Sequence, residues 1–296
     1  MGMKGFKGFE KDFSCKGKQY EENTTYEEHG VGCCHKGVMH FYEDPWEVLN
    51  HYDLVDDNGN FSEFAEVEAL GQVWNDGEKR ATNKIHIGAK LGLKGFLKAC
   101  IDFTLEKTKY ESNGTNLSGN SAQIGSSGNS AKIGSSGNSA KIGSSGYYAQ
   151  IGSSGNSAKI GSSGYYAKIG SSGYYAQIGS SGYYAQIGSS GNSAKIGSSG
   201  NYAKIGSSGD FAQIGSSGNS AQINSTGEDA VIMCAGSRSK AKGKKGSWIT
   251  LAEWVKDEEK GRYVPVCVKT ERVDGEKIKE DTYYTLKNGE FVEVEE

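Results

Sequence analysis

A nine-residue repeat limits what this chain can fold into more than any other feature of its sequence. Twelve consecutive units of the form Gly-x-x-Ala-(Lys/Gln)-Ile-Gly-Ser-Ser begin at Gly119 and end at Thr226, with small departures in the last unit. A flexible Gly/Ser linker needs only the composition and no period. The fixed phase of Ala and Ile in all twelve units therefore predicts an ordered repeat structure.

The phase of the apolar residues predicts an extended backbone. In "NSAKI", Ala131 and Ile133 are two residues apart and point to the same side of a strand, while Ser130 and Lys132 point to the other. Ala and Ile would line a thin interior, and Lys or Gln would face water. We expect "GSSG" to form the corner, with glycine at positive φ and serine satisfying backbone groups.

The variable pair of each unit indicates the size of one coil. A nine-residue unit is too short to enclose an interior, whereas two units make a two-sided coil of eighteen residues. In alternate units from Gly128 the pairs read Asn-Ser, Tyr-Tyr, Tyr-Tyr, Tyr-Tyr, Asn-Tyr and Asn-Ser, and in the other set they are mostly Asn-Ser. The aromatic residues thus segregate to one side, which predicts six coils and, at about 4.8 Å per coil, a rod of roughly 29 Å.

The flanking regions predict two further parts. Residues 1–110 mix aromatic, β-branched and charged residues and are expected to form an α+β domain. Strands are predicted in "FAEVEALGQVW" and "NKIHIGAKL", and "LGLKGFLKACIDF" is a helix or a strand. A short helix is predicted in Asp44–Tyr52, because Asp44 can cap it and Pro45 suits its first turn.

Residues 247–296 are strand-like and are expected to cap the solenoid. "KNGE" (Lys287–Glu290) places Asn-Gly between two such runs, which is a strong hairpin signal. "SRSKAKGKKG" is interpreted as a basic loop. The predicted fold is mainly β: an α+β domain (1–110), a two-sided parallel β-solenoid of nine-residue units (111–246) and a C-terminal β cap (247–296).

Composition favours a cytoplasmic protein with free thiols. The net charge is −3, with a mildly basic repeat between acidic ends, and the N-terminus lacks the apolar core of a secretory signal. No apolar run approaches the roughly 20 residues that span a bilayer. The six cysteines are too dispersed for a disulfide framework.

Several kinds of chemistry are excluded by the residues present. The spacing resembles calcium-binding β-rolls, but the turn carboxylates that would bind calcium are missing. The flat threonine array of an ice-binding face is absent from the repeat. A metal site from Cys15, Cys33, Cys34, His35 and His40 has poor spacing for zinc. Without a phosphate-binding loop or a nucleophile motif, we predict no catalytic residue, no metal and no cofactor.

One segment nevertheless resembles part of an enzyme family. "KGVMHFYEDPWEVLNHY" is similar to the strand and helix that frame the nicotinamide pocket of ADP-ribosyltransferases, with Gly37, His40, Phe41 and Tyr52 at the matching positions. That resemblance implies a later catalytic acid, for which Glu66 and Glu68 are candidates. The alternative interpretation is a strand followed by a packed helix.

Two groups of residues are predicted to bind a partner. The first is an aromatic stripe on the solenoid, which comprises Tyr147, Tyr148, Tyr165, Tyr166, Tyr183, Tyr184 and Tyr202. The second is a basic patch of Arg238, Lys240, Lys242, Lys244 and Lys245. Exposed aromatic residues often mark an interface, so a homodimer through the solenoid is one possibility. Contact with nucleic acid through lysines and tyrosines is possible but not favoured.

The order of the parts resembles a family of uncharacterised phage and prophage proteins of gut Firmicutes. "KGFKGFEKDFSCKGKQYEENTTYE", "GVMHFYEDPWEVLNHY", the "AKIGSSG" array and "GSWITLAEW" (Gly246–Trp254) carry this similarity. Where the family has a cysteine after its "GFHF" segment, this chain has Tyr42. The resemblance implies a role inside an infected cell, most concretely as a non-enzymatic inhibitor of a host defence complex such as a CRISPR effector. The alternatives are an ADP-ribosyltransferase-like enzyme with a solenoid spacer and a structural virion component.

Overall fold

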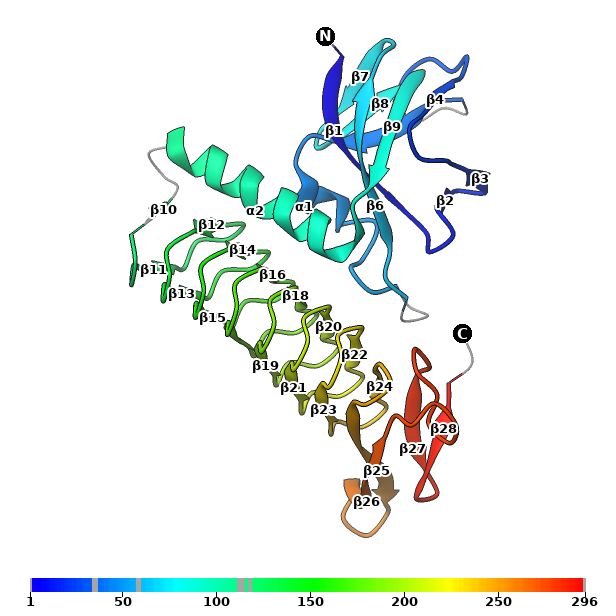
Figure 1. The fold of residues 1–296 in the computed structure, drawn as a ribbon, viewed down its shortest axis with the longest axis vertical. Helices are drawn as coiled ribbons and strands as arrows, with labels where there is room; N and C mark the ends of the chain where they lie inside the picture. Colours follow the sequence, from blue (N-terminus) through cyan, green and yellow to red (C-terminus); the bar gives the residue numbers. More distant parts are fainter. Residues whose placement is uncertain (1, 34–36, 57–59, 111–114, 117–118, 295–296) are drawn as a thin grey trace. The chain divides into compact units, whose positions relative to one another are not determined.

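The computed structural model describes residues 2–33, 37–56, 60–110, 115–116 and 119–294, with the side chains of these ranges except 105–110 and 115–116. The chain divides into two compact units, of which the first ends at Phe103 and the second begins at Thr104 (Figure 1). Both units are built mainly from strands, as the sequence predicts. No helix among the described residues is both long and apolar enough to cross a membrane.

The first unit contains a seven-stranded antiparallel sheet in the order β4-β9-β6-β1-β5-β8-β7. Its strands are β1 (Met3–Phe9), β4 (Thr24–Glu27), β5 (Met39–Tyr42), β6 (Glu63–Ala69), β7 (Val73–Asp76), β8 (Lys79–Thr82) and β9 (Lys84–Lys90), beside a small pair β2 (Ser14–Cys15) and β3 (Lys18–Gln19). The two strands predicted in this region are confirmed as β6 and β9. Because β1 lies between β5 and β6, its side chains neighbour residues from distant parts of the sequence.

Two helices complete the first unit's core. In α1 (Pro45–Val48), Asp44 accepts a hydrogen bond from the Trp46 backbone N–H and Pro45 occupies the first turn, which confirms the predicted cap. The segment "LGLKGFLKACIDF", for which the sequence allows a helix or a strand, lies from Gly92 onward in a helix, α2 (Gly92–Tyr110). The Trp46 indole is fully buried and donates to the Cys100 carbonyl oxygen at 3.1 Å, which ties the two helices together.

The second unit is a β-solenoid in which each coil has eighteen residues, as predicted. One sheet, the even sheet, consists of β10 (Thr115–Asn116), β12 (Lys132–Ser135), β14 (Gln150–Ser153), β16 (Lys168–Ser171), β18 (Gln186–Ser189), β20 (Lys204–Ser207), β22 (Gln222–Ser225), β24 (Lys240–Lys242), β27 (Tyr284–Lys287) and β28 (Glu290–Glu293). The other, the odd sheet, consists of β11 (Gln123–Ser126), β13 (Lys141–Ser144), β15 (Lys159–Ser162), β17 (Gln177–Ser180), β19 (Lys195–Ser198), β21 (Gln213–Ser216), β23 (Val231–Cys234), β25 (Trp248–Asp257) and β26 (Arg262–Arg272).

Identical residues stack through the solenoid because the parallel strands pair in register. Ile151 pairs with Ile169 in the even sheet and Ile142 with Ile160 in the odd sheet. Each of the twelve repeat isoleucines is at most 4% exposed. The first serine of each "GSS" also faces inward: Ser153 and its equivalents from Ser135 to Ser225 are buried. The interior therefore contains Ala, Ile and Ser in repeating layers.

The position of the corner differs from the prediction. Each strand is Lys/Gln-Ile-Gly-Ser, so the first half of "GSSG" belongs to the strand, and the turn follows it. The residue with positive φ is the second member of the variable pair, for example Tyr166 at 56°, and not a repeat glycine. The first glycine of the unit is needed for another reason: a Cβ on Gly182 would lie 1.9 Å from the Gly164 carbonyl oxygen of the preceding coil.

The C-terminal strands extend both sheets, as expected for a cap. β25 continues the odd sheet in parallel with β23 and then pairs antiparallel with β26, while β27 pairs antiparallel with β24. The predicted hairpin at "KNGE" is confirmed, with positive φ at Asn288 and Gly289 between β27 and β28. The prediction that "SRSKAKGKKG" forms a loop is wrong, because Lys240–Lys242 forms β24 of the last coil.

Two glycines from consecutive repeat units, Gly179 and Gly182, allow a direct test of the packing between coils. Gly182→Ala should destabilise the solenoid by about 3 kcal/mol or more, because the new methyl overlaps a backbone oxygen that cannot move alone. Gly179→Ala is the matched control: nothing lies within 4 Å of its Cβ position, so stability should change by no more than about 1 kcal/mol. Urea unfolding followed by circular dichroism measures both free energies; equal effects would show that the preceding coil does not confine Gly182.

Candidate functional site

The variable pair lies in the turn between the two sheets, and its first member stabilises the turn in one of two ways. Where this residue is asparagine, its side-chain oxygen accepts the backbone N–H of the equivalent residue one coil further on: Asn129 accepts from Tyr147 at 3.1 Å, and Asn138 from Asn156 at 2.9 Å. A tyrosine ring has no such acceptor, and the rings of Tyr147, Tyr165 and Tyr183 stack instead. Tyr147 lies on Tyr165, with centroids 5.2 Å apart and planes 9° from parallel.

The second member of the pair forms a second stack beside the first. Its backbone N–H donates across the turn to the next coil, as from Tyr148 to the Tyr165 carbonyl at 2.9 Å. The rings of Tyr148, Tyr166, Tyr184 and Tyr202 follow one another at 4.9–5.1 Å and are within 8° of parallel. Four successive coils thus carry aromatic residues on one edge.

The predicted aromatic stripe is therefore brought together on one surface, here named the tyrosine strip. Its members are Tyr147, Tyr148, Tyr165, Tyr166, Tyr183, Tyr184 and Tyr202, each 39–52% exposed. Because stacked neighbours cover the ring faces, the outward parts are the ring edges and hydroxyls. On the opposite edge a single Tyr174–Tyr175 pair and Phe211 interrupt the Asn-Ser pairs.

The five residues of the predicted basic patch lie where the last coil meets the cap, and four of them contact its side chains. Lys244 forms ion pairs with Asp281 at 2.8 Å and Glu280 at 3.6 Å, and these carboxylates raise the pKa of its ammonium group. The ammonium groups of Lys240 and Lys242 lie 4.9 and 4.8 Å from the centre of the Tyr283 ring. Arg238 donates to the Tyr263 hydroxyl at 3.2 Å. Lys245 is exposed, and its backbone N–H donates to Glu280 at 3.5 Å. These contacts attach the cap to the rod.

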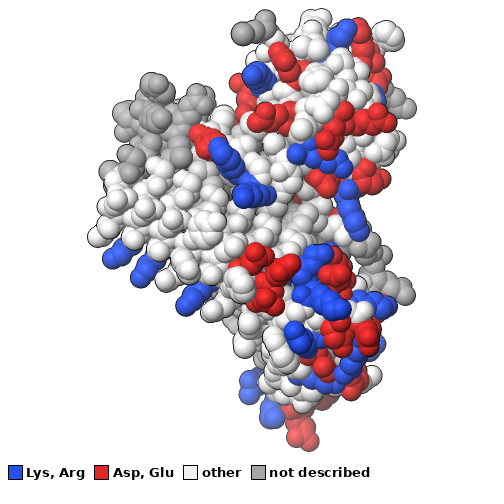
Figure 2. All heavy atoms as spheres, in the orientation of Figure 1, with Lys and Arg blue, Asp and Glu red and all other residues white. Residues whose placement is uncertain are grey.

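The outer face of the odd sheet carries a shallow groove that the sequence analysis did not anticipate. It has a volume of about 1180 Å³ and runs along the column Gly125, Gly143, Gly161, Gly179, Gly197 and Gly215. Next to these glycines stand lysines and glutamines such as Lys159 and Gln177, and the groove ends at the exposed Val231 and Met233. Figure 2 shows that charged side chains are sparse along the repeat.

The first unit contains a cavity that was also missed. About 430 Å³ in volume, it is lined in part by Lys7, Cys15, Tyr20 and His40, and an adjoining hollow of about 180 Å³ adds Tyr52. Lys7, on β1, is only 4% exposed, and burial lowers the pKa of its ammonium group. Its Nζ donates to the His40 carbonyl oxygen at 3.1 Å and to the Cys15 Sγ at 3.4 Å.

The geometry around His40 bears on two interpretations of the sequence, the ADP-ribosyltransferase resemblance and the Cys/His metal site. His40 Nε2 contacts the Cys33 carbonyl oxygen rather than a thiol, and burial lowers the pKa of its imidazole. Cys34 and His35 lie outside the described residues, among which no cluster of three potential metal ligands is found. Neither Glu66 nor Glu68 lines the cavity that contains His40 and Tyr52.

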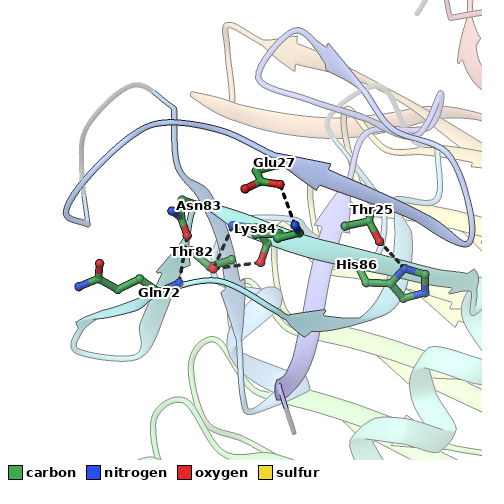
Figure 3. A network of polar contacts seen from close by, with 7 residues as sticks. All are labelled: Thr25, Glu27, Gln72, Thr82, Asn83, Lys84 and His86. Carbon is green, nitrogen blue, oxygen red and sulfur yellow. Dashed lines mark hydrogen bonds and ion pairs between the residues drawn. The ribbon is translucent and has the colours of Figure 1, made fainter.

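A polar network on β4 and β9 accounts for the remaining histidine of this sheet. His86 Nδ1 lies 3.1 Å from the Thr25 hydroxyl, and Lys84 pairs with Glu27 at 2.7 Å, which lowers the pKa of the Glu27 carboxyl (Figure 3). Asn83 accepts the Gln72 backbone N–H, and Thr82 bonds to the Lys84 backbone. The network links an edge strand to its neighbour and faces no cavity described above.

Residues 3–99 match one family model. Its description is "Domain of unknown function (DUF7666)". The match covers most of the first unit and none of the repeat, so it shows only that the N-terminal region resembles this domain. No curated protein and no solved structure matches the chain.

The strip should be replaceable without loss of the fold, since serine already occupies the same turn position elsewhere. Combined Tyr148→Ser, Tyr166→Ser and Tyr184→Ser substitutions remove three ring contacts, so stability should fall by only about 1–3 kcal/mol while the far-ultraviolet circular dichroism spectrum is kept. Tyr175→Ser, on the opposite edge, is the control and should cost less. Loss of the β spectrum in the triple variant would show that these rings belong to the core.

Proposed function

We propose that this protein is a non-enzymatic interaction protein whose solenoid presents the tyrosine strip to a protein partner. The observation that carries the proposal is the gathering of seven exposed tyrosines into two parallel stacks on one edge of a regular scaffold. At 39–52% exposure each, they offer on the order of 700 Å² of surface. A standard protein interface buries about 800 Å² on each partner.

The orientation of the rings favours a protein over a single-stranded nucleic acid. Unpaired bases bind by stacking on open aromatic faces. In the strip these faces are turned toward neighbouring rings, at 4.9–5.2 Å between centroids, so bases would find free faces only at the ends of each stack. Ring edges and hydroxyls, by contrast, combine apolar contact with hydrogen bonding, which makes tyrosine frequent at protein interfaces.

The contacts of the basic residues also favour a protein partner over a nucleic acid. Lys240, Lys242 and Lys244 are engaged with aromatic and acidic side chains of the cap, so a phosphate backbone would compete with these contacts. The repeat itself contributes few lysines, and they are separated along the rod (Figure 2).

The more specific form of the proposal follows the resemblance to phage proteins: the partner is a host defence complex such as a CRISPR effector, bound in the cytoplasm. A second copy of the chain is the alternative occupant of the strip, and a virion protein is a third. The ADP-ribosyltransferase alternative has less support, since its candidate acids Glu66 and Glu68 do not line the cavity that contains His40.

The proposal is tested by changing the strip to the chain's own Asn-Ser pair. The variant carries Tyr147→Asn, Tyr148→Ser, Tyr165→Asn, Tyr166→Ser, Tyr183→Asn and Tyr184→Ser, and the control carries Tyr174→Asn and Tyr175→Ser on the opposite edge. The wild type and the control should bind a purified CRISPR effector complex, and the strip variant should lose at least about tenfold in affinity.

Sedimentation of each protein alone and with the effector distinguishes the possible occupants. A dimer that only the strip variant loses would assign the surface to a second copy. If the strip variant retains the oligomeric state of the wild type and binds every tested partner with equal affinity, the proposed function is wrong.

A further inference from the structure

The cavity of the first unit places a buried ammonium group beside a thiol. Lys7 Nζ is surrounded by the Cys15 Sγ at 3.4 Å, the His40 carbonyl oxygen at 3.1 Å and the rings of Phe9 and Tyr20, each 5.4 Å from ring centre to nitrogen. Among the described residues no carboxylate pairs with it. Buried charges in proteins are normally paired, so an ammonium group at this position would be stabilised by an anion close to its nitrogen.

The sulfur of Cys15 is placed to be that anion. Besides the Lys7 contact, the Tyr52 hydroxyl donates to Cys15 Sγ at 3.0 Å, so two donors converge on one sulfur. A neutral thiol is a weak acceptor, whereas a thiolate accepts charge-assisted hydrogen bonds well. The pKa of the Tyr52 hydroxyl is raised by burial and by this hydrogen bond, which keeps Tyr52 a donor.

The cavity wall indicates the charge of a suitable ligand. Among the described residues, those that are charged and line the cavity are Lys7, Lys16, Lys18, Lys79 and Glu28, and Glu28 is already paired with Lys18. Cys15 is half-buried and borders both hollows, so a small molecule that enters can reach its sulfur. A volume of about 430 Å³ lies within the range of small-molecule sites.

We propose that Cys15 is a nucleophile, positioned by Lys7 and Tyr52 and reacting as its thiolate, in a site for small anionic electrophiles that bear a carboxylate or phosphate group. In the reaction, the sulfur lone pair forms a bond to the electrophilic carbon, and the leaving group departs with its bonding electrons. Lys7 and Tyr52 remain protonated throughout. This site is separate from the tyrosine strip, and the proposal does not depend on the proposed function.

The test compares two alkylating reagents that differ in charge. The folded full-length chain is treated with iodoacetate or iodoacetamide, and mass spectrometry follows modification at Cys15 and at Cys267, a half-buried cysteine of the second unit. The ratio of iodoacetate to iodoacetamide rates should be about tenfold higher at Cys15 than at Cys267. In each case an S–C bond forms and iodide leaves.

Variants separate the positioning residues from general effects on the fold. Lys7→Met should remove the preference for iodoacetate, and Tyr52→Phe should slow both reagents at Cys15. Lys98→Met is the control, because Lys98 pairs with Asp102 on α2 and lines neither hollow.

Should a variant fail to fold, the wild type still decides the question. Millimolar inorganic phosphate should protect Cys15, but not Cys267, from iodoacetamide. Equal or slower modification of Cys15 relative to Cys267, without preference for the anionic reagent, would overturn the proposal.

Discussion

The in-register pairing of residues eighteen apart is the interaction on which the solenoid depends. It places Ile151 under Ile169 and joins consecutive coils by hydrogen bonds in the strands and across the turns. The same close approach explains why the first glycine of a unit cannot be replaced, as the 1.9 Å between a Gly182 Cβ and the Gly164 oxygen shows. Ala, Ile, the first Gly and the first Ser are therefore fixed by the packed interior and by the close approach of neighbouring coils, whereas the variable pair lies outside the interior and can contact the next coil in more than one way.

The variable pair converts this regularity into a surface. An asparagine at its first position bonds to the next coil through its side-chain oxygen, whereas a tyrosine stacks on a tyrosine in the next coil. Stacking requires aromatic residues in successive coils, so tyrosines at this site are favoured in runs. One such run, repeated at both positions of the pair, makes the tyrosine strip, whose outward ring edges and hydroxyls suit a protein partner.

Much of the second unit could be predicted from the sequence because its contacts repeat with the sequence period. Most aromatic residues of the repeat fall in alternate units, which places them on one edge of an eighteen-residue coil. The corner was misplaced because glycine usually marks positive φ, yet here the left-handed residue is Tyr166 or its equivalents. The cluster of Lys7, Cys15 and Tyr52 was not predicted because no periodicity links these positions. It forms only when β1, which carries Lys7, lies beside β5. The chain continues from β5 into α1 and then into the loop that carries Tyr52. Likewise, no local pattern shows that Lys244 faces Asp281 of the cap.

Contacts between tyrosine rings reveal the length of one coil, since they report which repeat units are neighbours. Nuclear Overhauser spectra of the chain with selectively labelled tyrosine, assigned through single Tyr→Ser variants, should show cross-peaks between Tyr148 and Tyr166 and between Tyr166 and Tyr184, whose ring centres are 5.1 Å apart. Loss of both peaks in Tyr166→Ser would agree with the eighteen-residue coil. Cross-peaks between residues nine apart, such as Tyr166 and Tyr175, would contradict it.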